Sequence, residues 1–386
     1  MFIGMSLGAT VGSIRKKPSG NWEARYRDTY GRPRGKSFNT KREAQMYLQR
    51  VGADMQRGDW LDPRIARTTF AQWAEAWMAT KVNLRGGTRV GYGSILETHV
   101  LPDFGTIAVG RIDKLMIKGW IAHKVATGVG PGTIRNAFGV LRQVLGGAVD
   151  GGALRINPCD GIDLPRVARE EMHFATHDQI ATLANAIAHP EDEKGRRKGT
   201  FERYGLLVLL DAYTGLRFGE IAALRRKRID IVNKRIDVTE SVREVSGRLE
   251  YSATKTYETR SAPLPQFLVD SLADLLTKIP EDPEAFVFTS PDGEPLRNGN
   301  FRARHFKRAV SLAGLPDGFR IHDLRHTFAA FLVAEGAHPL AVTKRLGHSS
   351  IQVTHDRYGH LFPHLEADLT AALDAAGRAA RMVHSN

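Results

Sequence analysis

Apolar and charged residues alternate over residues 22–28 with the period of a β-strand, which gives one apolar and one charged face. A Tyr-Gly-Arg-Pro turn follows, and residues 36–39 have the composition of a third strand. Thr40 and Glu43 then form a capping-box pattern that opens a helix. We therefore predict a three-stranded sheet with one helix behind it within residues 1–65.

The next hundred residues follow a helical period instead. Thr69 and Gln72 mark a second capping box. Between residues 132 and 149 an apolar stripe recurs every three or four positions, at Ile134, Phe138, Leu141, Leu145 and Ala148. The opposite face carries Arg135 and Arg142, which suit phosphates and base edges, although a plain solvated face fits equally well. We predict a helical domain over residues 66–165.

Residues 163–171, with Pro165, have the composition of a linker. Beyond it, helices are predicted at 176–189 and 201–213, strands within 228–264 with a Ser246-Gly247 turn, and helices again after Pro265. A third, α+β domain over residues 170–386 follows. The expected fold class is a multidomain chain, mainly α with small β-sheets.

Charge changes this picture more than composition does. The 386 residues are 42% hydrophobic and 25% charged, which is ordinary for a globular protein, but the net charge is +13. Such an excess favours a polyanionic partner. No apolar run approaches the roughly 20 residues that span a bilayer, so we expect nucleic acid rather than a membrane.

The N-terminal domain holds about half of that charge, since 13 Lys and Arg oppose 6 Asp and Glu over residues 1–65, a balance of +7. Because a basic sheet face can enter a DNA groove, we predict that its cations contact DNA. These are Arg25, Arg27, Arg32, Arg34 and Lys36.

The chain has one cysteine, Cys159, which excludes an internal disulfide framework and fits a reducing compartment. The N-terminus lacks the basic and apolar regions of a secretion signal. We expect a cytoplasmic protein.

Candidate chemistry lies in two places. Cleaving a phosphodiester needs preorganised cations for the phosphate oxygens, a nucleophile, and a proton for the leaving oxygen. Arg217 follows a Thr-Gly-Leu turn near a predicted helix start, and Glu220, three residues on, can orient it. Arginine suits phosphate because its planar fork donates to two oxygens at once. Taken alone, this pair is more often a surface salt bridge.

The second place lies between residues 322 and 360. His322 and Arg325 share one face of a predicted first helical turn. His326 stands at zinc-ligand spacing from His322, but an Asp follows His322 and no cysteine cluster supports a metal, so we interpret His326 as a helix neighbour. His348 follows a helix-ending glycine, and Tyr358 comes ten residues later. A tyrosine nucleophile needs a lowered pKa or a base, which clustered arginines and a histidine would supply.

The order Arg217, Lys255, His322, Arg325, His348, Tyr358 resembles the active-site pattern of the tyrosine recombinases, the phage integrase family. The flanking motifs match as well: Thr-Gly-Leu-Arg-x-x-Glu, Leu-Arg-His-Thr-Phe-Ala, Leu-Gly-His-Ser-Ser and Arg-Tyr-Gly-His. The resemblance covers most of residues 170–365. It also makes residues 66–165 similar to a core-binding domain and residues 1–65 similar to an arm-type DNA-binding domain.

The resemblance implies a mechanism. Tyr358 would attack a DNA phosphate, giving a 3′-phosphotyrosyl link and a free 5′-hydroxyl. Arg217 and Arg325 would hold the phosphate, while His322 would act as acid or base. His348 would hydrogen-bond a phosphate oxygen and Lys255, in a turn with Lys234 nearby, would protonate the leaving oxygen. No nucleotide cofactor and no metal would be needed.

The resemblance further implies a homotetramer on two DNA duplexes that passes through a four-way Holliday junction, with the tail after Phe362 docked on a neighbouring subunit. The extra N-terminal domain favours a phage or mobile-element integrase acting at attachment sites. A host DNA-bending factor and an excisionase are compatible partners that no residue identifies. The alternatives are a chromosomal dimer resolvase or transposon recombinase, a non-catalytic DNA-binding regulator, and a metal-dependent nuclease.

Overall fold

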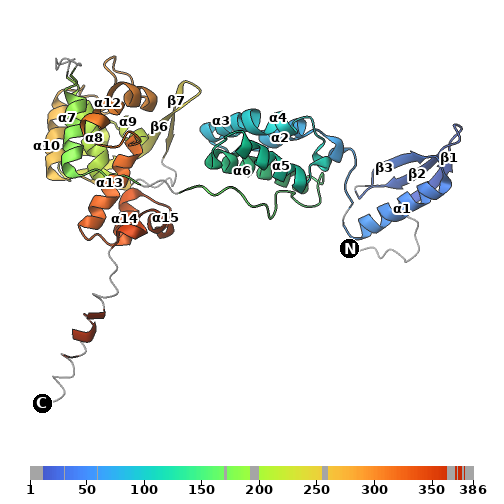
Figure 1. Cartoon of the computed structure of the whole chain (residues 1–386). Helices are drawn as coiled ribbons and strands as arrows, with labels where there is room; N and C mark the ends of the chain where they lie inside the picture. Colours follow the sequence, from blue (N-terminus) through green and yellow to red (C-terminus); the bar gives the residue numbers. More distant parts are fainter. Residues whose placement is uncertain are drawn as a thin grey trace. The chain divides into compact units, whose positions relative to one another are not determined.

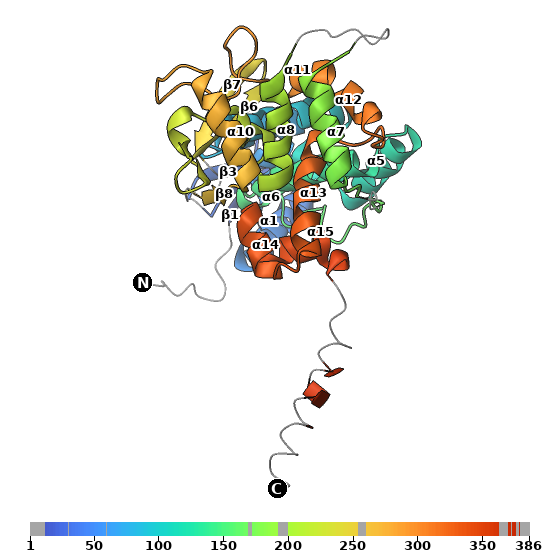
Figure 2. The same ribbon diagram turned by 90° about the vertical axis from the view of Figure 1, so that its left-hand side faces the viewer.

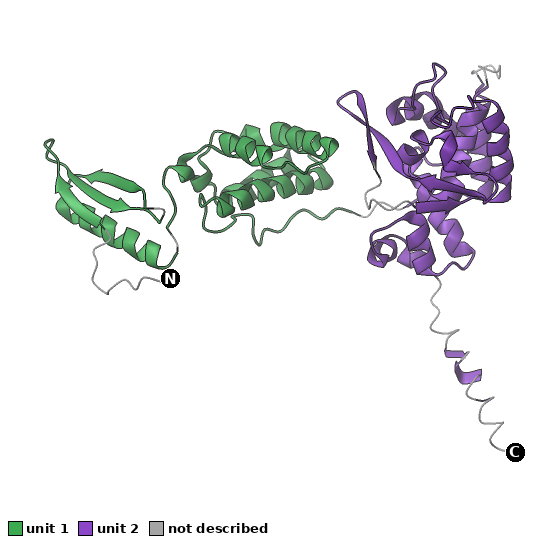
Figure 3. Cartoon of the chain, turned by 180° about the vertical axis from the view of Figure 1, so that it is seen from behind, with its two compact units in different colours: residues 1–169 green, residues 170–386 purple. Residues whose placement is uncertain are grey.

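The computed structural model describes residues 12–29, 31–58, 60–168, 172–191, 200–253 and 260–362, and a few positions between 370 and 378. The chain divides into two compact units, residues 1–169 and 170–386 (Figure 3). Most of the described chain is helical, and its small sheets are antiparallel (Figure 1). The predicted fold class is confirmed.

The first unit begins with the predicted three-stranded sheet. Strands β1 (Gly12–Lys16), β2 (Trp22–Arg27) and β3 (Pro33–Phe38) pair in that order, and helix α1 (Lys41–Gln56) covers one face (Figure 1). The helix starts at the predicted capping box, where Thr40 Oγ1 accepts from the backbone of Glu43 and the Glu43 carboxylate accepts from the backbone of Thr40. A small core of Ala24, Tyr26, Ala44, Leu48 and Val51 joins helix to sheet.

The rest of the first unit is helical. Its main helices are α2 (Phe70–Ala79), α3 (Gly86–Ile95), α4 (Leu101–Phe104), α5 (Lys114–Ala126) and α6 (Pro131–Asp150). Short non-α turns lie at Ile65–Arg67, Leu96–Val100 and Val109–Arg111. The apolar stripe predicted on α6 is buried along its whole length, and α2 starts at the predicted capping box of Thr69 and Gln72.

Helix α8 (Glu202–Thr214) lies at the centre of the second unit. It packs against α7 (His177–Ala188), α10 (Gln266–Thr277) and α13 (Ile321–Ala334), as Figure 2 shows. The remaining helices are α9 (Phe218–Ala222), α11 (Asn298–Phe301), α12 (Lys307–Leu312), α14 (Pro339–Leu346) and α15 (Ile351–Tyr358), with non-α helical turns at Arg226–Arg228, Arg302–Phe306 and Gly359–Leu361. The predicted helices at 176–189 and 201–213 are confirmed.

Two small sheets flank this bundle. Strands β4 (Ile229–Asp230), β5 (Arg235–Val238) and β8 (Arg260–Pro263) form one sheet, and β6 (Glu240–Val245) pairs with β7 (Arg248–Ala253) in the other. The predicted turn joins β6 to β7, with Ser246 and Gly247 both at positive φ, 49° and 77°. Two positive φ values in succession suit the twist of an antiparallel hairpin.

Candidate active site

The end of α8 carries Arg217 into the site. Gly215 ends the helix in the left-handed conformation, with φ of 64°, and a Cβ there would lie 2.4 Å from the ring of Phe328. The chain can therefore turn here only with glycine. Arg217 becomes the N-cap of α9, and its side chain is 44% exposed.

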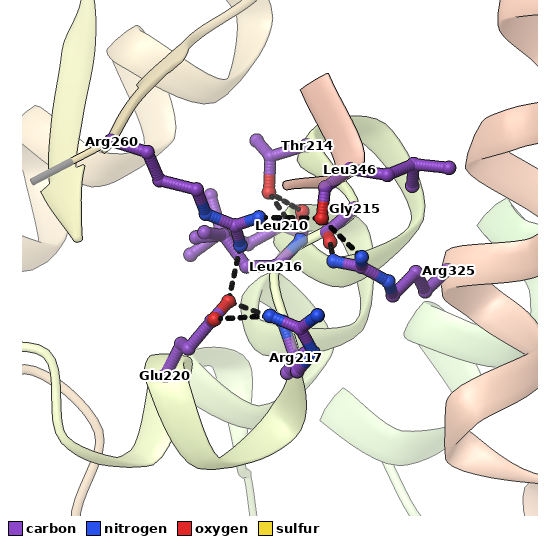
Figure 4. Close-up of polar contacts among 9 residues, drawn as sticks. All are labelled: Leu210, Thr214, Gly215, Leu216, Arg217, Glu220, Arg260, Arg325 and Leu346. Carbon is purple, nitrogen blue, oxygen red and sulfur yellow. Dashed lines mark hydrogen bonds and ion pairs between the residues drawn. The ribbon is translucent and has the colours of Figure 1, made fainter. Parts of the chain in front are cut away.

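Glu220 holds Arg217 as predicted. Its Oε1 accepts a hydrogen bond from Arg217 Nη1 at 2.9 Å, and its Oε2 accepts from the Arg217 backbone N–H at 2.8 Å (Figure 4). The Glu220 side chain is only 3% exposed. A buried carboxylate thus fixes a guanidinium whose own surface is open to a ligand.

Arg325 lies on α13 and is 2% exposed. Its Nη1 donates to the carbonyl of Gly215 and its Nη2 to the carbonyl of Leu346 (Figure 4). Burial, then the nearby Arg217 and Arg260, lower its pKa to about 9, so it is still a cation at neutral pH. Arg325 therefore joins the ends of α8 and α14 beside Arg217.

Figure 4 also contains Arg260, which we did not predict as a site residue. It donates from Nη1 to the Leu346 carbonyl at 2.7 Å, and its Nη2 forms an ion pair with Glu220. Neither partner is near it in sequence, so no local pattern indicated this contact.

His322 lies in the first turn of α13, and its side chain is exposed. Desolvation by neighbouring groups lowers the pKa of His322, and the positive charges of Arg325 and Arg357 lower it further. A cation near a histidine disfavours protonation, so His322 is a neutral imidazole at pH 7 that can accept a proton. Its ring lies 4.7 Å from that of His326.

His326, interpreted from the sequence as a helix neighbour of His322, has a further contact in the structure. His326 is buried, and its Nδ1 lies 2.6 Å from the hydroxyl oxygen of Tyr358. The i, i+4 spacing from His322 places both histidines on one face of the helix. Helix α13 brings this face against Tyr358 at the end of α15.

Gly347 ends α14 in the left-handed conformation, at φ of 61°, and His348 follows as predicted. The His348 Nδ1 lies 2.9 Å from Thr354 Oγ1, and its ring stands parallel to that of Tyr358, with 6.4 Å between centroids. Burial, then Arg325, Arg217 and Arg357, lower the pKa of His348 to about 4.

Tyr358 ends α15 and is 1% exposed. Burial raises its pKa, and the opposing effect of Arg325 and Arg357 is smaller. Both arginines act on the pKa of this phenol in the expected direction, but burial outweighs them. Tyr358 is a neutral phenol that is hydrogen-bonded to His326.

Lys255 lies outside the described residues, between the end of β7 and the start of β8. The nearby Lys234 occupies the turn between β4 and β5, with φ of 50°. Lys255 as the proton donor stays a prediction.

The site makes the stability of the second unit depend on pH. Burial lowers the pKa of His326 and of His348 to about 4, whereas both would titrate near 6.5 when unfolded. Between pH 6.5 and 4 these two histidines are protonated in the unfolded chain but stay neutral in the folded chain. The free energy of unfolding therefore falls as the pH drops from about 7 towards 4. We expect a loss of a few kcal/mol, at about 1.4 kcal/mol per pKa unit.

Urea denaturation at pH 7, 5.5 and 4.5 measures this loss. His326→Asn should remove about half of the pH dependence, because His348 contributes the other half; the exposed His355→Asn is the control. Equal stability of the wild-type chain at pH 7 and 4.5 would contradict the expected burial of neutral imidazoles.

The predicted DNA contacts of the first unit divide by sheet face. Directly opposed residues of antiparallel strands share a face. Arg25 pairs with Ser13 and Gly35, away from α1, whereas Arg34 pairs with the buried Tyr26. Arg34 forms ion pairs with Asp28, at 2.7 Å, and with Asp62. The structure therefore gives Arg34 a structural role in place of the predicted DNA contact.

The other predicted contacts are exposed. Lys36 lies on the α1 face, with its Nζ 5.0 Å from the Tyr47 ring centre. Arg27 shares the open face with Arg25, and Arg15, which we did not predict, also lies there. Arg32 follows the turn between β2 and β3.

The two cations predicted on α6, Arg135 and Arg142, both have partners within the chain. Arg135 donates to the Pro165 carbonyl at 2.9 Å, and Arg142 forms an ion pair with Asp160 at 2.8 Å in which both side chains are more than half exposed. Exposed ion pairs of this kind contribute little to stability, so Arg142 can leave Asp160 and bind a phosphate instead. Both DNA contacts stay predictions.

Within the described parts of the chain, no helix has the length and apolar character of a membrane span. The same residues contain no group of three His, Cys, Asp or Glu side chains arranged to hold a metal ion.

Three family models match the chain. Residues 173–364 match the model of the phage integrase family, residues 10–57 that of the phage integrase N-terminal domain, and residues 69–125 that of the phage integrase N-terminal SAM-like domain. The integrase of prophage phiRv2 from Mycobacterium tuberculosis is 28% identical over 376 residues, which is 94% of each chain.

Solved structures share the fold. The Tn1549 transposon integrase, solved in complex with a circular intermediate DNA, is 21% identical and superposes with a TM-score of 0.68 over 80% of this chain and 99% of that one. A lambda integrase tetramer bound to a Holliday junction is 17% identical, with a TM-score of 0.55 over 87% and 95% of the two chains.

Proposed function

Because the chain belongs to the phage integrase family of tyrosine recombinases, and is therefore a site-specific DNA recombinase, we propose that it cuts and rejoins DNA through Tyr358. The observation that carries this proposal is the convergence of Arg217, Arg325, His348 and Tyr358 from four separate helix ends or turns. A non-catalytic DNA-binding regulator would not need a buried phenol beside two guanidinium groups.

The proposed first step is a transesterification. The Tyr358 oxygen attacks the scissile phosphorus, a new oxygen–phosphorus bond forms, and the bond from phosphorus to the 5′-oxygen breaks. Arg217 and Arg325 meet the charge that builds on the non-bridging oxygens, and His348 donates a further hydrogen bond. The phenolic proton passes to a neutral imidazole, for which His322 is the predicted acceptor. Lys255 gives the 5′-oxygen its proton.

The reverse reaction rejoins DNA. A 5′-hydroxyl from the partner duplex attacks the 3′-phosphotyrosyl link, so the bond energy is kept and Tyr358 is released. Two such exchanges through a Holliday junction recombine two sites. We propose that a homotetramer carries them out, supported by the lambda integrase tetramer that shares this fold.

We further propose that the substrates are attachment sites of a phage or other mobile element, in the cytoplasm of a bacterial host. The phiRv2 integrase and the Tn1549 transposon integrase, both from mobile elements, support this assignment. The open basic face with Arg15, Arg25 and Arg27 would bind arm-type DNA, and α6 with Arg135 and Arg142 would bind the core. A host bending factor and an excisionase would act on the same DNA.

Covalent capture tests the function. A duplex library with randomised arms and a nick in the central spacer is incubated with the protein, and complexes that survive denaturant are sequenced. The nick lets the short cleaved strand diffuse away, so the adduct accumulates. We expect enrichment of one core duplex; no denaturant-stable adduct from folded protein would overturn the proposal.

The role of Lys255 has its own test on that core duplex. Lys255→Ala should slow cleavage by about 10²–10⁴-fold because the leaving alkoxide then receives no proton. A 5′-bridging sulfur in place of oxygen should restore the rate, since a thiol has a pKa near 8.5 and leaves as the anion. Lys234→Ala is the control. Loss of cleavage in Lys234→Ala that sulfur restores would move the role to Lys234.

A further inference from the structure

Arg260 is the first residue of β8 and follows directly on the segment that contains Lys255. Its side chain is 18% exposed, and both terminal nitrogens have partners: Nη1 donates to the Leu346 carbonyl at 2.7 Å, and Nη2 pairs with Glu220 (Figure 4). The catalytic scheme above does not use this cation. It is nevertheless in contact with the groups that hold the two phosphate-binding arginines.

The first shared group is Glu220. Its carboxylate accepts from Arg217 through Oε1 and from Arg260 through Oε2 (Figure 4). If Arg217 were the only partner of Glu220, the negative charge of the carboxylate would cancel the positive charge of that arginine. Arg260 offsets the carboxylate instead, so Arg217 is held in place and its positive charge remains available to a ligand.

The second shared group is the Leu346 carbonyl, which accepts from Arg260 and from Arg325 (Figure 4). This carbonyl ends α14, immediately before Gly347 and His348. A Cβ on Gly347 would lie 2.6 Å from Arg260 Nη1, so the guanidinium approaches the turn as closely as glycine allows. Arg260 thereby fixes the backbone from which His348 projects.

Charge leads to the same conclusion. The hydrogen-bonded cluster contains three guanidinium groups, on Arg217, Arg260 and Arg325, and one ionised carboxylate, on Glu220. The other carboxyl close by belongs to Asp211, which is fully buried, and burial raises its pKa well above the usual range. Counted without Asp211, whose charged form burial disfavours, the formal charge of the cluster is 3 − 1 = +2. A phosphodiester carries −1, and its pentavalent transition state carries −2.

We propose that Arg260 is a positioning residue for DNA cleavage, which balances Glu220 and fixes the Leu346 carbonyl so that Arg217, Arg325 and His348 meet the same phosphate. The proposal rests on the function proposed above. Arg260 does not contact the reacting atoms; it acts through Glu220 and Leu346.

Single-turnover cleavage of the selected core duplex by Arg260→Met tests this. Methionine keeps much of the side-chain volume and removes the charge. We expect cleavage to slow by about 100-fold, the size of effect that a misplacement of about 1 Å produces, while the Kd for the duplex changes less than about threefold. Arg235→Met is the matched control: it lies on the adjacent strand, pairs with Asp230, and is 47% exposed.

A second duplex separates this role from a general packing defect. Replacing a non-bridging oxygen of the scissile phosphate with a methyl group removes one negative charge. The defect of Arg260→Met should then shrink by at least about tenfold, because less cluster charge is required. A folding defect would slow both duplexes equally, and that result would overturn the proposal.

Should Arg260→Met fail to fold, the double variant Arg260→Met/Glu220→Gln removes the buried carboxylate together with Arg260 and keeps the formal charge of the cluster at +2. It should fold and cleave within about tenfold of wild type, whereas Glu220→Gln alone should not. A double variant that folds and yet cleaves no better than Glu220→Gln would contradict charge balancing. Failure of wild-type protein to form any adduct would instead count against the proposed function.

Discussion

Tyr358→Phe is expected to abolish the covalent protein–DNA adduct, with a loss of at least about 10⁴-fold in cleavage. Phenylalanine keeps the ring that stands parallel to His348, but it has no oxygen to attack phosphorus. Because Tyr358 is 1% exposed, it contributes little surface to the initial complex. Binding of the core duplex, measured by fluorescence anisotropy, should stay within about threefold of wild type.

The matched control is Tyr204→Phe. Tyr204 is buried in the same unit and donates its hydroxyl to the Thr289 carbonyl at 3.1 Å, so its loss also removes a buried hydrogen bond. Each variant should lose about 1–2 kcal/mol of unfolding free energy, and only Tyr358→Phe should lose the adduct. An adduct of normal yield from Tyr358→Phe would assign the nucleophile elsewhere.

Arg325→Lys is expected to have the second largest effect. Lysine keeps the charge but has no planar fork, so it cannot donate to the Gly215 and Leu346 carbonyls and still present donors to a phosphate. Cleavage of the core duplex should fall by about 10²–10³-fold, the cost of losing one preorganised donor to a developing anion.

Stability should fall as well, since one of the two buried hydrogen bonds that Arg325 donates is lost, at a cost of about 1–3 kcal/mol in unfolding free energy. Arg345→Lys makes the same change at an exposed position on α14 and should leave cleavage and the urea midpoint unchanged. Arg325→Lys with wild-type cleavage would mean that charge alone, and not the fork, is needed here.

Local patterns predicted the elements well because the interactions that set them are local. The capping boxes at Thr40 and Thr69 each close within four residues, and each opens a helix in the structure. The contact between Arg217 and Glu220 is of the same kind, an i, i+3 pair at a helix start. Such features depend on backbone geometry that a short stretch of sequence determines.

The contacts that were missed join distant parts of the chain. Arg260 meets Glu220 across 40 residues, and His326 meets Tyr358 across 32. Its positive charge groups Arg34 with the other cations of the basic face, but strand pairing places it opposite Tyr26 and towards α1. Register between strands decides which face a residue occupies, and alternation within one strand does not reveal it.

The burial of Tyr358 also bears on how the protein would discriminate among DNA sequences. If Tyr358 is the nucleophile, as we propose, the protein around its buried side chain must open before any phosphate can reach it. A duplex that dissociates sooner than this opening leaves uncut, whatever its affinity at the first encounter. The time that a duplex stays bound would then decide whether it is cut, and the many brief collisions of a basic protein with chromosomal DNA would leave that DNA uncut.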